Sequence, residues 1–249
     1  MKYGWKRDAF DPRDHKYTLT APVALPAKVD LRDKCPGILN QGQLGACTAH
    51  ALANAHLFSQ LAQPGGVDSL PSRLWIYLQE RLIEGTQFED SGAQIRDGIK
   101  ALAAVGAPPE SEWPYDTSKF TEDVTSKFSD NALKHKITSY TSVPQSLVSI
   151  KTALFQEQHP IAFGFMVFES FEGQNVAQTG IVPMPQEHET ELGGHAVLMV
   201  GYDDACCAFI VMNSWGSEWG DHGFFYLPYA YATDPKLAQD FWLIKTVLE

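Results

Sequence analysis

The sequence lacks long hydrophobic runs. None of its 249 residues lies in a stretch that approaches the roughly 20 apolar residues of a membrane-spanning helix. The first eight residues, MKYGWKRD, lack the apolar core of a secretory signal peptide. Export through such a peptide is therefore not expected, and the compartment stays open. No internal repeat and no low-complexity tract interrupts the chain, which predicts one large domain or two small lobes.

Basic side chains are scarce in the second half. The net charge is −11, and residues 138–249 hold three basic and thirteen acidic side chains. This balance argues against nucleic acid as a partner. Part of the charge lies in Glu187–Glu191, shortly before His195. Two interpretations stay open, a solvated acidic loop or a field that attracts basic substrates.

Metal-binding motifs are also missing. The four cysteines are Cys35, Cys47, Cys206 and Cys207, and the adjacent pair cannot form a disulfide without a strained ring. There is no Cys-x-x-Cys pair and no His-x-x-x-His pair, and neither a phosphate-binding glycine loop nor a serine nucleophile elbow occurs. We therefore expect no metal and no cofactor.

The most informative segment that is present is Asn40–Ala49. It places Cys47 after a glycine-containing turn and before a run with helical spacing, and Gln41 stands six residues upstream. A thiol at a helix N-terminus faces free backbone N–H groups and the positive end of the dipole, which favours the thiolate. The Gln41 amide can donate to an oxyanion. The segment predicts that Cys47 is a nucleophile, provided that a general base lies close to it in the folded chain.

A base and its partner follow far downstream. His195 stands at the start of an apolar run, and Asn213 follows a second such run, with Trp215 and Trp219 close behind. A neutral histidine can take the thiol proton, and an amide oxygen can fix the ring tautomer. The other seven histidines lie in contexts without this signature.

Helical patterns dominate the first half and apolar strand patterns the second. The spacing predicts helices over 46–60, from Pro71 to Gly85, over 95–106 and over 144–155, with a polar, weakly helical region at 116–137. Strands are expected at 161–168, 196–202, 209–212, 223–227 and 241–247. This order indicates an α+β protein in which a helical lobe precedes an antiparallel, barrel-like sheet lobe.

The order Cys47, His195, Asn213 resembles the papain family of cysteine peptidases. His195 follows Cys47 by 148 residues, and about 130–150 residues separate these groups in that family. The resemblance covers residues 29–249 and implies a two-lobed fold with the active-site cleft between the lobes. It implies peptide-bond hydrolysis through a thioester, with Cys47 as nucleophile, His195 as base, Asn213 as orienting group and Gln41 as oxyanion donor. Trp215 and Trp219 would shield the histidine–asparagine hydrogen bond.

The chain departs from the family pattern at two positions. Leu44 stands where secreted members carry a disulfide cysteine, and Thr48 stands where an aromatic residue is usual. These departures indicate a divergent, bacterial-type member with a short leader, in which no oxidising compartment is required. The resemblance further implies that the following small residues and one tryptophan contact substrate: Ser91, Gly92, Ala93, Gly193, Gly194, Ala196 and Trp215.

Residues 1–28 form a leader that is shorter than the long prodomain typical of the family. We expect it either to lie on the surface or to cross the cleft, ahead of lobes at 29–137 and 138–249. The expected partners are peptide or protein substrates, a peptide inhibitor or the leader itself, and the chain is expected to be monomeric. Acyl transfer to an amine and isopeptide hydrolysis stay open as alternatives, as does a non-catalytic peptide-binding module.

Overall fold

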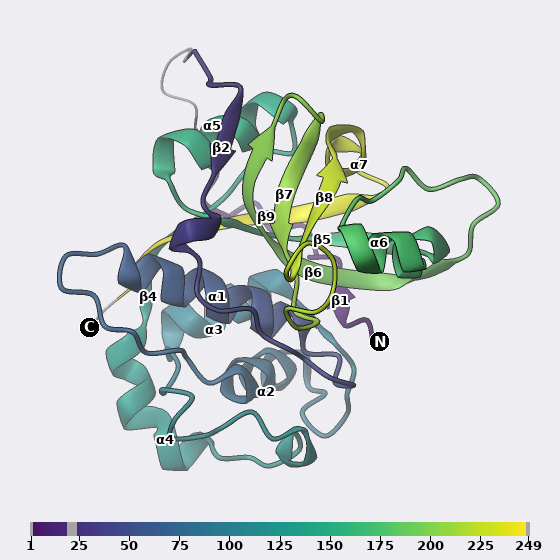
Figure 1. Ribbon diagram of the computed structural model, residues 1–249. Coiled ribbons are helices and arrows are strands. Elements are labelled where there is room, and N and C mark those ends of the chain that lie inside the picture. Colours follow the sequence, from purple (N-terminus) through teal and green to yellow (C-terminus); the bar gives the residue numbers. More distant parts are fainter. Residues whose placement is uncertain (1, 19–23, 248–249) are drawn as a thin grey trace.

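The computed structural model describes residues 2–18 and 24–247, so part of the predicted leader, 19–23, lies outside the described residues. The chain folds into a helical lobe and a sheet lobe (Figure 1). The predicted α+β, two-lobed architecture is confirmed. The predicted boundaries at residues 28 and 137 stay predictions. The described residues include no helix of the length and apolarity that a membrane crossing requires.

The helical lobe is built from α1 (Cys47–Leu61), α2 (Arg73–Glu84), α3 (Ile95–Ala104) and α4 (Thr125–Ala132). The expected helices at 46–60, 71–85 and 95–106 are confirmed within two residues at each end. The start of α2 is set by Ser72, whose side chain accepts a hydrogen bond from the Trp75 N–H. The helix ends at Gly85, where φ is +71°, a left-handed conformation that favours glycine.

The sheet lobe contains a seven-stranded antiparallel sheet in the order β4-β9-β5-β6-β7-β8, with β2 paired to β6. The five expected strands are confirmed, and β2 and β4 are added to them. The bounds are β2 (Lys28–Asp30), β4 (Ile137–Ser142), β5 (Ile161–Phe168), β6 (Glu191–Asp203), β7 (Ala208–Met212), β8 (Phe224–Pro228) and β9 (Ala238–Val247). Three helices accompany it: α5 (Leu147–Glu157), α6 (Gln174–Thr179) and α7 (Tyr229–Thr233).

Helix α1 lies between the two lobes and is buried around almost its whole circumference. It contacts α2 and α3 on one side and β5, β6 and β9 on the other. Four alanines between Cys47 and Leu61 keep it thin enough to fit between these layers. This position carries the first residue of α1, Cys47, up to β6, on which His195 lies.

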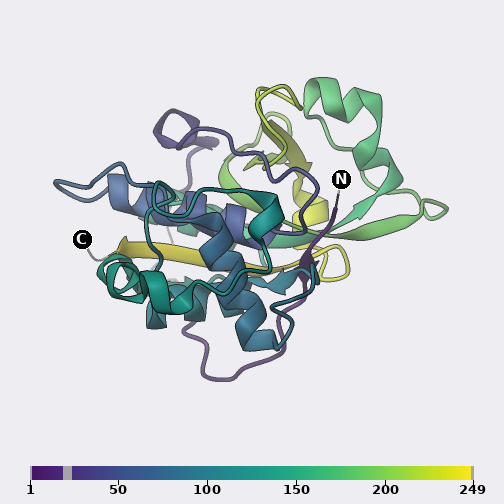
Figure 2. The ribbon, with the colours of Figure 1, turned by 90° about the horizontal axis from the view of Figure 1, so that it is seen from below.

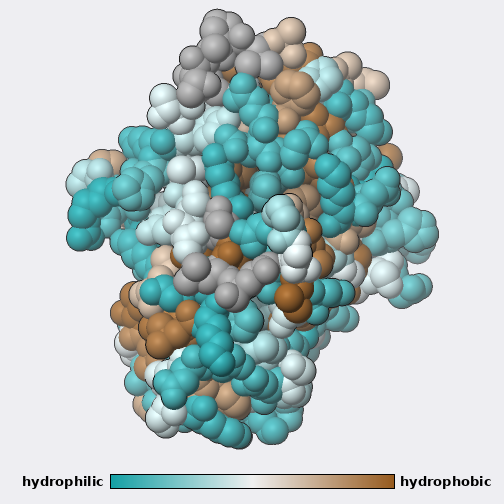
Figure 3. All heavy atoms as spheres, turned by 90° about the vertical axis from the view of Figure 1, so that its left-hand side faces the viewer, coloured by the Kyte–Doolittle hydropathy of each residue, from teal (hydrophilic) through white to brown (hydrophobic). Residues whose placement is uncertain are grey.

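A second, two-stranded sheet joins the start of the chain to the helical lobe. Strand β1 (Trp5–Lys6) pairs in parallel with β3 (Ala93–Gln94). Figure 2 shows the purple start of the chain running between the blue helices and the green-to-yellow strands. The face in Figure 3 is mainly hydrophilic with smaller apolar areas, as expected when most large apolar side chains are in the core.

Candidate active site

Cys47 lies at the first position of α1, fully buried. The Ala196 N–H on β6 points at its sulfur, with 3.4 Å from nitrogen to Sγ. The backbone N–H groups of Gly4 and Thr48 also act on the thiol. The predicted nucleophile is thus held between the two lobes by backbone donors, and one of these donors belongs to the leader.

His195 on β6 meets Asn213, which directly follows the neighbouring strand β7. The His195 Nε2 and the Asn213 Oδ1 are 2.8 Å apart. The same oxygen accepts the Ser214 N–H at 2.8 Å, which fixes the amide orientation. Trp215 stacks on the His195 ring with centroids 5.0 Å apart. These contacts agree with the expected orienting and shielding roles, and they leave the buried Nδ1 of His195 without a hydrogen-bond partner among the described residues.

Burial keeps both reactive groups neutral. It raises the pKa of the Cys47 thiol to about 11, and the nearby backbone N–H groups offset only part of this effect. It lowers the pKa of His195 to about 4, against the opposing effect of the Asn213 hydrogen bond. The prediction that the helix start favours the thiolate is therefore wrong for this state, because desolvation outweighs the helix dipole.

Gln41 is oriented by Ser214 and bound to the leader. The Gln41 backbone N–H donates to the Ser214 carbonyl at 2.9 Å. The Ser214 hydroxyl donates to Gln41 Oε1 at 2.7 Å. This leaves the Gln41 Nε2 free to donate to the carbonyl oxygen of Lys2, at 3.1 Å, and to that of Leu44, at 3.0 Å. The predicted oxyanion donor already holds a peptide carbonyl.

The leader tip, which we define as residues 2–6, runs through the cleft. At its centre, Gly4 accepts the Ala93 N–H at 2.7 Å and packs on the backbones of Gly45 and Gly92. Gly92 has φ +70°, and a Cβ there would overlap the Gly4 carbonyl. Of the two alternatives left open for the leader, the structure shows the cleft-crossing one for this tip.

The flanking tip residues occupy the sheet side. Tyr3 packs on Gly193, its ring lies 6.1 Å from that of His195 and 6.3 Å from that of Trp215, and its hydroxyl bonds Glu172. Trp5 packs on Gly164 and Gly194. The glycines expected to contact substrate therefore border the channel that the tip fills.

Ser91 is the expected substrate residue that the structure does not bring to the tip. Its hydroxyl bonds the Thr86 hydroxyl at 2.8 Å and the Gly92 carbonyl at 3.0 Å. The preceding residue, Asp90, reaches the cleft instead and forms an ion pair with Lys2. Asp90 and Ser214 were both missed by the sequence analysis, because an isolated Asp or Ser in a loop has no distinguishing pattern.

Asp90 also connects the loop before α1 with α2. Its carboxylate accepts the Gly45 N–H at 3.0 and 3.2 Å and the Tyr77 hydroxyl at 2.6 Å. The Thr48 hydroxyl donates at 2.8 Å to Glu80, whose pKa burial raises well above its usual range.

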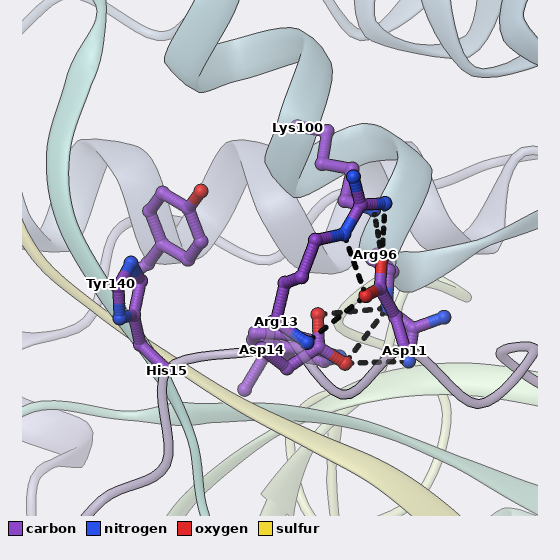
Figure 4. Close-up of a pocket in the computed structure, with 8 residues that line it drawn as sticks. Asp11, Arg13, Asp14, His15, Arg96, Lys100 and Tyr140 are labelled. Atoms are coloured by element: carbon purple, nitrogen blue, oxygen red, sulfur yellow. Dashed lines mark hydrogen bonds and ion pairs between the residues drawn. The ribbon is translucent and has the colours of Figure 1, made fainter.

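The leader anchor, residues 8–16, binds the body of the protein outside the cleft. Asp8 accepts the Trp242 indole N–H at 2.8 Å, and its own N–H donates to Asp240 at 2.8 Å. Asp14 pairs with Arg96 at 2.7 Å, and Asp11 pairs with Lys100 at 3.0 Å. Figure 4 shows the residues of the two latter ion pairs, which line one pocket together with Tyr140.

Among residues 2–18 and 24–247, no group of three metal-ligating side chains is close enough to hold an ion. Cys35, Cys206 and Cys207 are free thiols. Both ring nitrogens of His50 are engaged elsewhere, one with the Ala46 carbonyl at 2.8 Å and the other with Arg73 at 3.1 Å. The described residues therefore offer one site in which a thiol, an imidazole and an amide converge.

Comparisons with known proteins agree with this geometry. The family described as papain family cysteine protease matches residues 25–241. A peptidase C1-like protein of Acanthamoeba polyphaga mimivirus is 44% identical over 219 residues, which cover 85% of this chain and 70% of the relative. The crystal structure of xylellain, a cysteine protease from Xylella fastidiosa, matches with a TM-score of 0.87 at 41% identity, over 98% of this chain and 96% of that one. Digestive procathepsin L 3 of Tenebrio molitor shares the fold, with a TM-score of 0.73 at 20% identity over 94% and 75% of the two chains.

Proposed function

The chain belongs to the papain family of cysteine proteases, and we propose that its peptidase activity uses Cys47 as nucleophile, His195 as base and acid, Asn213 to orient His195, and Gln41 to stabilise the oxyanion. One observation carries this proposal. The backbone of the leader tip lies in the cleft with a carbonyl on the Gln41 amide and an N–H at the Cys47 thiol. A substrate backbone fits the same donors and acceptors.

Catalysis requires the leader tip to leave. Water then reaches the cleft, which relieves desolvation, lowers the pKa of Cys47 and raises that of His195. His195 takes the thiol proton, and Cys47 Sγ attacks the scissile carbonyl. The Gln41 amide and the Cys47 N–H stabilise the oxyanion. As the C–N bond breaks, His195 gives its proton to the leaving amine. Water, deprotonated by His195, then hydrolyses the thioester and regenerates the thiol.

With the tip docked, the chain is in an inhibited state. The tip excludes water from Cys47, and it occupies the Gln41 donor and the Ala93 N–H.

Removing the thiol tests the proposed nucleophile. In full-length protein that also carries Gly4→Ala to displace the tip, Cys47→Ala is expected to lower kcat on a quenched-fluorescence peptide library at least about 1000-fold, because no other group replaces the nucleophile. Cys206→Ala, which removes an exposed thiol, is the matched control and keeps full turnover. Persistence of turnover in Cys47→Ala, with its melting temperature near that of the parent, would overturn the assignment.

We also propose that the enzyme prefers basic residues near the scissile bond. The acidic second half supports this preference, and so does the docked Lys2. The loop Glu187–Glu191 is a weak source of this preference, because Glu189 turns back to accept the backbone N–H groups of Ser170 at 3.0 Å and Gln186 at 2.8 Å.

An assay with an added amine separates hydrolysis from acyl transfer, since only transfer yields a new amide.

A further inference from the structure

The Asp90 carboxylate lies in the wall of the cleft and faces the leader tip. The Gly45 N–H and the Tyr77 hydroxyl, both from the body of the protein, hold it in place. Its Oδ2 pairs with the ammonium of Lys2. The Asp90 side chain is 11% exposed with the tip docked. The body thus fixes the carboxylate, and the tip supplies its cation.

Asp90 depends on the leader for that cation. Within the part of the chain that the structure describes, Lys2 is the one basic side chain that forms an ion pair with Asp90. The nearby Arg81 guanidinium is turned to the backbone carbonyls of Gln87, Glu89 and Phe120 at 2.6–3.1 Å. When the tip leaves, a partly buried carboxylate faces the open cleft without a partner, and such a group binds an incoming cation strongly.

The neighbours of Asp90 show which substrate residue it meets. Gly4, whose N–H acts on the Cys47 thiol, packs on the backbone of Gly45. A Cβ on Gly45 would lie 3.1 Å from Asp90 Oδ1, so Asp90 adjoins the wall on which Gly4 packs. A side chain at the Gly4 position would meet the Gly45 carbonyl, so the guide is Lys2, whose carbonyl lies on the Gln41 amide and whose ammonium pairs with Asp90. A substrate residue whose scissile carbonyl takes the place of the Lys2 carbonyl on Gln41 can extend a long side chain to the carboxylate.

We propose that Asp90 makes the enzyme select lysine or arginine as the substrate residue that supplies the scissile carbonyl. This inference rests on the proposed peptidase function and assigns its specificity to one side chain. Lys2 of the leader occupies the carboxylate that the substrate cation binds. Because the ammonium and guanidinium ions both pair with carboxylates, the site accepts either one.

The test uses full-length protein with Gly4→Ala, which displaces the tip and leaves the body unchanged. Two pairs of peptides differ only at the residue that supplies the scissile carbonyl, arginine against citrulline and lysine against norleucine. We expect the charged member to have a kcat/KM at least about tenfold higher, as for hydrogen bonds to charged groups. Asp90→Asn is expected to bring both ratios to within about twofold of one, because it removes the charge and keeps an acceptor for Gly45.

Three further variants complete the test. Asp90→Glu restores a carboxylate and is expected to give ratios above those of Asp90→Asn, and it also serves if Asp90→Asn fails to fold. Asp130→Asn removes an exposed carboxylate on α4 and is the matched charge control, with unchanged ratios. Glu187→Gln tests the acidic loop and is expected to leave the ratios unchanged.

The outcomes separate this inference from the proposed function. Ratios near one in the protein with Asp90 intact, or high ratios that survive Asp90→Asn, would overturn the role of Asp90 while turnover of the citrulline peptide upholds the peptidase. A fall in the ratios caused by Glu187→Gln alone would transfer the selectivity to the acidic loop. If neither the four peptides nor the peptide library is cleaved at the same concentrations, the result would instead contradict the proposed function.

Discussion

The leader tip and the leader anchor belong to one segment, but different interactions hold them. Beside the side-chain contacts of Lys2 and Tyr3, the tip is bound through backbone groups that any peptide could offer, namely the Gly4 carbonyl on Ala93 and the Lys2 carbonyl on Gln41. The anchor is bound through side chains, such as the Asp14–Arg96 pair and the contacts of Asp8 with Trp242 and Asp240. The tip therefore competes with substrate, and the anchor raises its local concentration at the cleft.

The largest effect on this comparison is expected from a variant that displaces the tip from the cleft and keeps the anchor bound. Gly4→Ala places a Cβ on the Gly45 carbonyl, where rigid backbone cannot yield. We expect kcat/KM of the full-length protein to rise at least about tenfold, since a clash of this kind costs more than one tenfold step in docking. Peptide hydrolysis measures the change, and Thr18→Ala, at an exposed leader residue outside the tip and the anchor, is the control that changes nothing. A rate equal to that of the parent would show that the tip does not limit access.

A change in pH is expected to alter how strongly the leader docks, through Asp8 at the junction of tip and anchor. Asp8 and Asp240 lie together beside Trp5, Arg7, Arg96 and Trp242, and burial together with the Asp240 charge raises the pKa of Asp8 to about 7. In the docked leader, the Asp8 carboxyl therefore keeps its proton up to a pH of about 7. In the undocked leader, Asp8 loses this proton above its ordinary pKa of about 4. Docking is strongest at low pH and weakens as the pH rises toward 7.

Hydrogen exchange at the Ala93 amide, corrected for its intrinsic rate, reports leader opening. We expect opening to be at least about tenfold more frequent at pH 7 than at pH 5. Asp240→Asn removes the neighbouring charge, keeps an acceptor for Trp5, and is expected to flatten this dependence. Opening that becomes rarer with rising pH would contradict the sign that the carboxyl pair predicts.

The smallest effect is expected at the exposed edge of the anchor. Asp11 pairs with Arg13 and Lys100, whose side chains are 83% and 41% exposed. Because water and salt screen such pairs, Asp11→Asn is expected to change kcat/KM and leader opening by less than about twofold. A change as large as that of Gly4→Ala would mean that the surface ion pairs, and not the tip, control access.

The sequence predicts the groups that converge in the site but not the segment that covers them. The Cys47, His195 and Asn213 pattern predicted the meeting of α1 with β6 and β7, because apolar runs and glycine turns fixed these elements locally. Helices and strands were located within a few residues where the periodicity was strong. The short strands β1 and β3 have two residues each, too few for any period to show.

The position of the leader could not be derived from its residues. Lys-Tyr-Gly-Trp has no signature of its own, and its binding depends on glycines about 40 to 190 residues away, such as Gly45, Gly92 and Gly193. The protonation of the site was mispredicted for the same reason. The helix dipole acts locally and can be inferred from the sequence, whereas the burial of Cys47 that outweighs it results from tertiary packing, in which the Gly4 N–H reaches the thiol.

Modification of Cys47 by an epoxide inactivator of thiol peptidases, mapped by mass spectrometry in the full-length protein and in Gly4→Ala, tests the central claim most directly. Cys206 and Cys207, which are exposed, serve as internal controls for general thiol reactivity. We predict that Cys47 is protected in the parent and is selectively modified in Gly4→Ala. Equal modification of Cys47 in both proteins would contradict occlusion by the leader tip, and no modification in either would contradict its role as the nucleophile.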